Sequence, residues 1–165
     1  MLKAWAIIKD TDETRNTKLI IMGVDFGFEA EMFKLIDDLG IKDRVIVIRK
    51  PLREDVVSAY QACEFLVLPS RWELSPLTPL EGFAFKKPTI STKVHGIPYT
   101  INDGDNALLV EPENYQQLSD AILKLLRDSK MRSEYGLSGY KLVRDICNSK
   151  VMAKNTLKMY EEILG

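Results

Sequence analysis

Two glutamates, Glu73 and Glu81, flank the predicted start of a helix and have the chemistry of a binding site. The helix is expected to begin near Thr78, after a loop that follows a short apolar run at residues 65–69. A helix start presents unpaired backbone N–H groups and the positive end of the helix dipole, and both suit a phosphate. Carboxylates repel phosphate but accept hydrogen bonds from hydroxyl groups. The combination therefore indicates a site for a nucleoside diphosphate joined to a sugar.

Both glutamates also have a structural interpretation. Thr78, Pro79 and Glu81 have the spacing of a capping box with proline in the first turn. Spacing alone therefore does not decide whether Glu81 caps the helix or contacts a ligand. Glu73 taken alone is typical of a solvated loop carboxylate, and Trp72 is typical of a packing residue. The position of the pair favours binding, because ligands of doubly wound sheets lie beyond the carboxyl ends of the strands.

Strand-like and helical segments alternate along the first two thirds of the chain. Short, nearly continuous apolar runs are typical of buried parallel strands, and the helical segments between them carry their apolar residues on one face. This alternation predicts βαβ units with right-handed crossovers, and hence a Rossmann-like, doubly wound α/β fold. The expected strands are residues 18–23, 44–48, 65–69, 88–91 and 106–110, with helices at 29–39 and 54–63.

Beyond the fifth strand the pattern contains helices only. One helix is expected to start at Asn114, because Gln117 stands three residues on as in a capping box. Two more are expected, at residues 131–143 and from Ser149 onward. No repeat, linker or low-complexity tract divides the chain, so we predict a single domain over residues 1–165.

The start of the chain departs from this architecture. Residues 2–9 have the pattern of a helix, whereas a helix in a doubly wound fold normally follows a strand. We therefore expect one strand to be missing and the chain to be a piece of a longer protein. The missing strand would lie between the first and third strands named above. Its absence predicts either a repacked gap or an open sheet edge that favours a homodimer.

Composition excludes several classes of protein. Hydrophobic residues make up 45% and charged residues 28% of the 165 residues, which is typical of a folded soluble domain. The net charge of −1 is spread along the chain, so no basic surface for nucleic acid is expected. No apolar run reaches the roughly 20 residues of a membrane span, and no signal peptide is present, so a cytoplasmic location is predicted.

The cysteine and histidine content argues against a metal centre. His95 is the single histidine, and the two cysteines form no CxxC pattern, so no metal site is predicted. Cys63 and Cys147 lie far apart in the sequence, and free thiols in a reducing compartment are favoured over a disulfide, which the even number leaves open.

The segment at residues 69–84 resembles the Glu-x7-Glu motif of the group 1 (family 4) glycosyltransferases. Pro69, Ser70, Glu73 and Glu81 stand at the spacing of that motif. The resemblance covers nearly the whole chain and implies the C-terminal, donor-binding domain of the GT-B fold. Further matching segments are Tyr60-Gln61-Ala62-Cys63-Glu64-Phe65, Lys87-Pro88-Thr89-Ile90-Ser91, Gly96-Ile97-Pro98 and Asp103-Gly104-Asp105-Asn106-Ala107-Leu108-Leu109-Val110.

The resemblance implies an activity: metal-independent transfer of a sugar from a UDP-, GDP- or ADP-sugar, without a cofactor and with retained anomeric configuration. The donor's own phosphate would assist in place of a protein nucleophile. The full-length parent would be a hexosyltransferase of glycan biosynthesis, with its acceptor-binding N-terminal domain outside this chain. By the same resemblance, Glu73 is the catalytic residue and contacts the donor sugar, and Glu81 binds the ribose. The resemblance also places the backbone of Leu74, Ser75 and Leu77 near the sugar and diphosphate. Arg49 and Lys50 would border the nucleobase.

The chain departs from the family pattern at several positions. Leu74-Ser75-Pro76 replaces the usual Gly-Phe-Gly, and Pro76 has no N–H to donate. Ala84 and Phe85 stand where smaller residues are commoner. The family's Gly-Arg-Leu strand and the lysine after it, which neutralise the diphosphate, would precede Met1. We therefore expect weak binding of UDP or GDP and no transferase turnover by this chain alone.

Two other functions remain open at this stage. One is a non-catalytic nucleotide-binding or assembly module of GT-B type, and the other is a nucleotide-sugar 2-epimerase, which shares the fold. A dinucleotide-binding oxidoreductase is disfavoured, because Gly23 and Gly27 do not form a Gly-x-Gly-x-x-Gly motif. A phosphate-loop nucleotidase is disfavoured because the chain has no Gly-Lys-Ser/Thr sequence.

Overall fold

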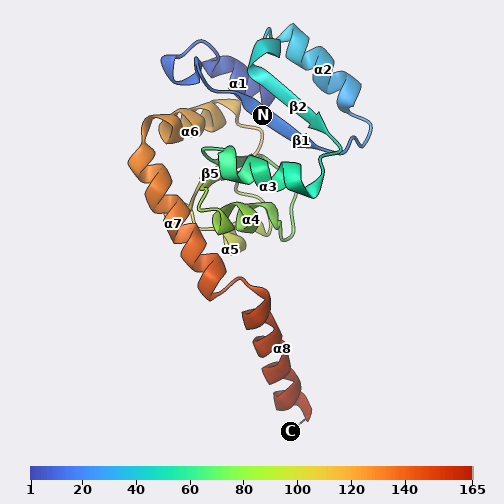
Figure 1. The fold of residues 1–165 in the computed structure, drawn as a ribbon, viewed down its shortest axis with the longest axis vertical. Helices are drawn as coiled ribbons and strands as arrows, with labels where there is room; N and C mark the ends of the chain where they lie inside the picture. Colours follow the sequence, from blue (N-terminus) through green and yellow to red (C-terminus); the bar gives the residue numbers. More distant parts are fainter. Residues whose placement is uncertain (165) are drawn as a thin grey trace.

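The computed structural model describes residues 1–164 and contains five parallel strands with helices on both of their faces (Figure 1). The predicted α/β fold is confirmed. The strands are β1 (Leu19–Gly23), β2 (Val45–Arg49), β3 (Leu66–Leu68), β4 (Thr89–Thr92) and β5 (Ala107–Val110). The helices are α1 (Leu2–Ile8), α2 (Glu29–Asp38), α3 (Arg53–Ala62), α4 (Thr78–Ala84), α5 (Ile97–Thr100), α6 (Tyr115–Arg127), α7 (Ser129–Asp145) and α8 (Ser149–Leu164).

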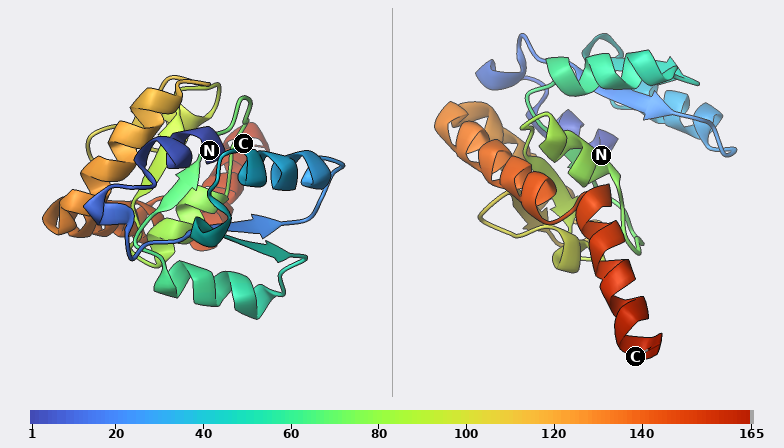
Figure 2. Two further views of the ribbon diagram at one scale, coloured as in Figure 1. Left: turned by 90° about the horizontal axis from the view of Figure 1, so that it is seen from above. Right: turned by 60° about the horizontal axis from the view of Figure 1, so that its bottom comes forward.

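The strands form two separate parallel sheets. β1 pairs with β2, and β3, β4 and β5 pair in that order, so Ile90 at the centre of β4 faces Val67 on one side and Leu108 on the other. In Figure 2 the blue and teal arrows of β1 and β2 lie apart from the green strands of the second sheet. β1 and β3 therefore each have an edge that no strand of residues 1–164 covers. This is the gap between the first and third strands that the sequence predicts.

A hydrophobic core bridges the two sheets on one side. Leu19 of β1 and Ile90 of β4 belong to the same cluster of buried side chains, together with Trp5 of α1. Helix α6 contributes a stripe at helical spacing, with Leu118, Ile122 and Leu125 all buried. Apolar packing of α1, α2 and α6 thus holds together two sheets that share no strand pairing.

A second core on the opposite face fixes α4, the helix that follows β3. Phe83 of α4 is fully buried beside Ile97 of α5 and Ala107 of β5. Helix α7 approaches α4 closely because two of its residues are glycines: a Cβ at Gly139 would lie 2.3 Å from the ring of Phe83, and one at Gly136 would lie 2.0 Å from the carbonyl oxygen of Lys86. A side chain at either position would push α7 away from α4.

The three C-terminal helices predicted from the sequence are present as α6, α7 and α8. Asn114 caps α6 as expected, since its side chain accepts a hydrogen bond from the backbone N–H of Gln117 (3.0 Å). Helix α8 extends away from the two cores (Figure 1) and exposes apolar side chains, among them Ile163 and Leu164. None of the helices in residues 1–164 has the length and apolar character needed to cross a membrane.

The open edge of β3 makes a testable prediction about its backbone amides. The N–H of Leu66 donates to Pro88 next to β4 (2.9 Å), so strand alternation points the N–H of Val67 away from β4 and into the gap. We expect the Val67 amide to exchange with deuterium at least about tenfold faster than that of Ile90, which lies between two strands. Residue-resolved hydrogen exchange measures this difference. Equal protection at Val67 would mean that another segment already pairs with β3.

Candidate functional site

Glu73 and Glu81 both lie at the carboxyl end of β3, where the sequence predicts them. Glu73 is half-buried in the loop between β3 and α4, and Glu81 is in the first turn of α4. Within residues 1–164 neither carboxylate forms an ion pair with a lysine or arginine. Both carboxylates therefore retain oxygens that can accept hydrogen bonds from a ligand.

Hydroxyl groups of β4 anchor the beginning of the Glu73 loop. The Ser91 hydroxyl donates to the carbonyl oxygen of Leu68 (2.7 Å), and the Thr92 hydroxyl donates to that of Ser70 (2.6 Å). Ser70 in turn donates its side-chain hydroxyl to Oε1 of Glu73 (3.0 Å). A chain of hydrogen bonds thus runs from a fully buried strand to the Glu73 carboxylate.

The turn after β4 holds the other side of the same loop. The backbone N–H of Gly96 donates to the carbonyl oxygen of Glu73 (3.1 Å). A Cβ at Gly96 would lie 1.4 Å from the carbonyl oxygen of Leu74, so only glycine fits here. The neighbouring His95 places its ring 6.0 Å from that of Trp72. The Gly96-Ile97-Pro98 turn therefore sets the position of the Glu73 backbone.

The capping-box interpretation of Glu81 is wrong. Helix α4 begins at Thr78, so Thr78 is the first helical residue and not the N-cap. Leu77 is the N-cap, and no side chain caps the helix. The Glu81 carboxylate points elsewhere: its Oε2 accepts a hydrogen bond from the Tyr60 hydroxyl at the end of α3 (2.6 Å). The Glu81 side chain thus does not cap α4, and its orientation depends on Tyr60 of α3.

Tyr60 begins one of the segments that resemble the family, but the sequence assigns it no role at this site. The residue is 9% exposed, and its ring stacks on Phe85, with 5.5 Å between ring centroids and 15° between ring planes. Burial, and then the hydrogen bond to Glu81, raise the pKa of Tyr60 well above its ordinary value. The phenol therefore stays protonated and donates to the carboxylate. Periodicity marks Tyr60 only as an apolar-face residue of α3, and its contact with α4 is not visible in that pattern.

The loop residues between the two glutamates are arranged for backbone contacts. The side chains of Leu74 and Leu77 are mostly exposed, whereas Pro76 and Pro79 are buried and fix the course of the chain. Within residues 1–164 the backbone N–H groups of Leu74, Ser75 and Leu77 donate to no protein carbonyl. These three donors lie between Glu73 and Glu81 in the sequence, and their role at a ligand remains a prediction.

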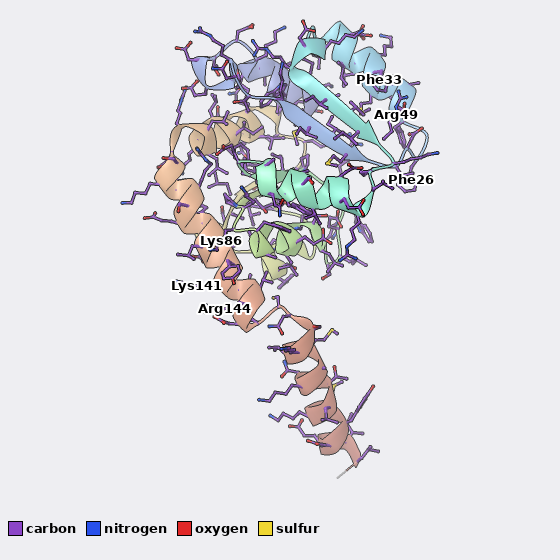
Figure 3. All side chains as sticks on the ribbon, viewed as in Figure 1. Phe26, Phe33, Arg49, Lys86, Lys141 and Arg144 are labelled. Atoms are coloured by element: carbon purple, nitrogen blue, oxygen red, sulfur yellow. The ribbon has the colours of Figure 1, made fainter. Side chains whose placement is uncertain are left out.

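The structure does not bring Arg49 or Lys50 into contact with the two glutamates. The Arg49 guanidinium contacts Glu29 (2.5 Å) and lies 4.9 Å from the centre of the Phe33 ring. Figure 3 shows Arg49 beside Phe33 on the part of the molecule formed by β2 and α2. Lys50 follows β2 with a left-handed backbone (φ 49°). A role for both at the nucleobase remains a prediction.

A cavity of about 660 Å³ opens beside the site, between the two sheets. Ile21 of β1 lines one side, and Pro69 and Arg71 after β3 line the other. Arg71 forms an ion pair with Glu113 at this cavity (2.9 Å). Neither Glu73 nor Glu81 lines it, although its volume is that of a small-molecule site. The cavity therefore adjoins the glutamate pair through residues 69–71 and does not contain it.

The residues described offer no metal centre. Across residues 1–164 no group of three or more histidine, cysteine, aspartate or glutamate side chains is close enough to hold a metal ion. Cys63 and Cys147 are both free and partly buried, and burial raises the pKa of the Cys63 thiol. The arrangement supports recognition by hydrogen bonds from carboxylates and backbone amides.

Comparison with known proteins identifies the family. The family model for glycosyl transferases group 1 matches residues 1–142. An uncharacterized glycosyltransferase of Methanocaldococcus jannaschii is 30% identical over 150 residues, which cover 87% of this chain and 42% of that protein. The D-inositol 3-phosphate glycosyltransferase of Corynebacterium diphtheriae is 30% identical over 141 residues, which cover 84% of this chain and 33% of the enzyme.

Solved structures agree at the level of the fold. Anabaena HepE, crystallised in complex with UDP, superposes with a TM-score of 0.85 at 18% identity over 98% of this chain and 44% of its own. The chain thus spans less than half the length of the curated relatives it matches. With a family model that covers most of its length, this chain belongs to the group 1 glycosyltransferases.

Proposed function

We propose that this chain is the donor-binding domain of a glycosyltransferase that transfers a sugar from a nucleoside-diphosphate sugar and retains its anomeric configuration. The observation that carries the proposal is the pair Glu73 and Glu81, held by independent hydrogen bonds on either side of the start of α4. The UDP bound to HepE, a protein of the same fold, supports it.

The carboxylate oxygens that have no hydrogen-bond partner suggest which part of the donor each glutamate binds. Glu73 accepts from Ser70 through Oε1, which leaves Oε2 for a hydroxyl of the sugar. Glu81 accepts from Tyr60 through Oε2, which leaves Oε1 for the ribose. The backbone N–H groups of Leu74, Ser75 and Leu77 then face the sugar and diphosphate, whereas Pro76 contributes no donor.

In this assignment the groups that react belong to the donor and the acceptor, and not to the protein. Glu73 orients the sugar, and no protein nucleophile takes part. The bond between the anomeric carbon and the diphosphate breaks, an acceptor hydroxyl adds to the same face, and its proton passes to the departing phosphate oxygen. This course needs no cofactor and no metal ion, and it places the transition-state charge on the diphosphate beside the backbone donors.

The remaining parts of the proposal concern what lies beyond this domain. The acceptor and its binding domain, the choice among UDP-, GDP- and ADP-sugars, and a place in glycan biosynthesis are proposed for the whole protein. A homodimer through the open sheet edge and a cytoplasmic location stay predictions. Light scattering after size-exclusion chromatography tests the homodimer.

A non-catalytic module of the same fold is the second candidate, and the state of Arg71 favours it. Arg71 is the arginine nearest in sequence to Glu73, and it is paired with Glu113 rather than free for a diphosphate. The two candidates differ in turnover and not in binding. Release of free nucleotide from a bound sugar donor, measured with the acceptor domain present, separates them.

Replacement of Glu81 tests the binding site directly. Calorimetric titration with UDP-, GDP- and ADP-sugars should detect binding of at least one donor, and Glu81→Ala should weaken it by about tenfold or more, since hydrogen bonds to a charged group contribute about 1.5–3 kcal/mol. Glu134→Ala is the matched control, because Glu134 is an exposed residue of α7 that forms an ion pair with the exposed Lys130, away from the two glutamates. Absence of heat with every donor, in a protein shown to be folded, contradicts the proposal.

Replacement of Gly96 tests whether the loop geometry matters for binding. Gly96→Ala would force its Cβ into the carbonyl oxygen of Leu74, so the Glu73 loop must move, and donor affinity should fall by about tenfold or more. Gly23→Ala is the control, since a Cβ there meets nothing within 4 Å. Titration and thermal unfolding of both variants provide the comparison. Unchanged affinity in Gly96→Ala would show that the position of this loop does not govern binding.

A further inference from the structure

The hydrogen bond between Tyr60 and Glu81 joins helices α3 and α4, which are labelled in Figure 1. Tyr60 is in the last turn of α3, and Glu81 is in the first turn of α4. The two oxygens are 2.6 Å apart, which is short for a neutral donor and typical of a hydroxyl donating to a carboxylate. The contact therefore fixes one oxygen of Glu81 relative to α3.

The phenol can act as a fixed donor because its ring cannot move freely. Tyr60 is buried, and its ring stacks almost parallel on that of Phe85. The Phe85 ring therefore supports the tyrosine that holds Glu81.

Glu81 needs such a support because its own environment does not fix it. Glu81 is exposed, and a glutamate side chain on a helix surface has several rotamers available. Ordering these rotamers on ligand binding would cost conformational entropy. The hydrogen bond to Tyr60 is already present in the unbound protein, so it lowers that cost, and it leaves Oε1 without a hydrogen-bond partner among residues 1–164.

We infer that Tyr60 is a positioning residue, which holds the Glu81 carboxylate in the orientation that accepts the ribose hydroxyls of the donor. The inference rests on the proposed function of this domain, and it extends that function to selectivity for the ribose hydroxyls of the nucleotide. Tyr60 touches Glu81 and not the ligand. Its effect on binding is therefore confined to nucleotides that present hydroxyl groups to Glu81.

The Tyr60 phenol keeps its proton over the working range of the test. Burial and the neighbouring carboxylate raise the pKa of Tyr60, so the phenol remains a donor at neutral and mildly alkaline pH. The other titratable groups close to α3 at this point are Cys63, Glu64 and Lys87, and burial raises the pKa of the Cys63 thiol as well. Binding experiments near pH 7.5 therefore sample one protonation state of the Tyr60 phenol.

The test is Tyr60→Phe, which removes the hydroxyl and keeps the ring. Titration with UDP and with 2′,3′-dideoxy-UDP, or with the guanine or adenine pair if that base is preferred, gives the ribose selectivity of each variant. We expect Tyr60→Phe to bind UDP about threefold to tenfold more weakly and to bind the dideoxy nucleotide as the unchanged protein does. In a Glu81→Ala background, where no side-chain acceptor remains for the phenol, the same replacement should have no further effect, since the two residues act together.

Two further variants separate positioning from general destabilisation. Tyr140→Phe removes a hydroxyl from α7, where the ring lies under Lys86, and should change neither affinity. Phe85→Leu keeps the Tyr60 hydroxyl but removes its stacking partner, and it should reduce the preference for ribose in the same direction as Tyr60→Phe. It also serves as the test if Tyr60→Phe fails to fold. Thermal unfolding establishes that each variant is folded.

The outcomes distinguish this inference from the function on which it rests. If the unchanged chain binds no nucleotide, both are overturned. If it binds UDP but Tyr60→Phe lowers the affinities for UDP and dideoxy-UDP by the same factor, or lowers neither, the positioning role alone is overturned. Tighter binding of UDP by Tyr60→Phe also overturns it, because Tyr60 would then hold Glu81 away from the ligand.

Discussion

The site depends on hydrogen bonds from buried hydroxyl groups to carbonyl oxygens at the end of β3. The strand ladder ends at Leu68, so the carbonyl groups that follow lose their partners on β4 while still partly buried. An unpaired buried carbonyl is costly, by about 1–3 kcal/mol. The Thr92 hydroxyl supplies a donor to the carbonyl of Ser70 beyond the ladder, and the Ser91 hydroxyl adds a donor to that of Leu68 at its last residue. They continue the strand interaction into the loop, and this gives the segment before Glu73 a fixed course.

Each glutamate is held by a different part of the chain, and this makes the pair sensitive to several elements at once. Glu73 is fixed by Ser70 and by the turn at Gly96, whereas Glu81 is fixed by Tyr60 on α3. The helix that carries Glu81 is in turn held by close packing of α7 at Gly136 and Gly139. Residues distant from the ligand therefore determine the distance between the two carboxylates, because packed elements move as units.

The sequence predicted the strands and the position of the glutamates well because both follow from local patterns. Continuous apolar runs mark buried parallel strands, and β1 and β2 begin within one residue of their expected starts. The predictions that failed or fell short depend on contacts between distant segments. The capping box at Thr78 is absent because Thr78 is itself the first helical residue and Leu77 is the N-cap. The helix at Ile97–Thr100 was expected only as a turn.

Tyr60 is a residue whose role at the site cannot be read from the sequence pattern. In the sequence it is one apolar-face residue among several in α3, and 21 residues separate it from Glu81. Helical periodicity reports that a side chain is buried, but it does not report which element lies opposite. Only the approach of α3 to α4 turns a core tyrosine into a partner of a binding-site carboxylate.

The split between the two sheets has a consequence for a ligand that spans them. Glu73 and Glu81 follow β3, whereas Arg49 and Lys50 follow β2, which belongs to the other sheet. Within residues 1–164 no strand pairing connects these halves, and the connection is made by the apolar core under α1 and α6. Hydrophobic packing is not directional, whereas a strand ladder fixes register to a single residue. On the proposed function, the sugar end of the donor would meet a well-ordered site and the base end a site whose distance from it is less sharply set. A polypeptide strand that paired with both β1 and β3 would convert the two sheets into one and couple the two ends of the donor site.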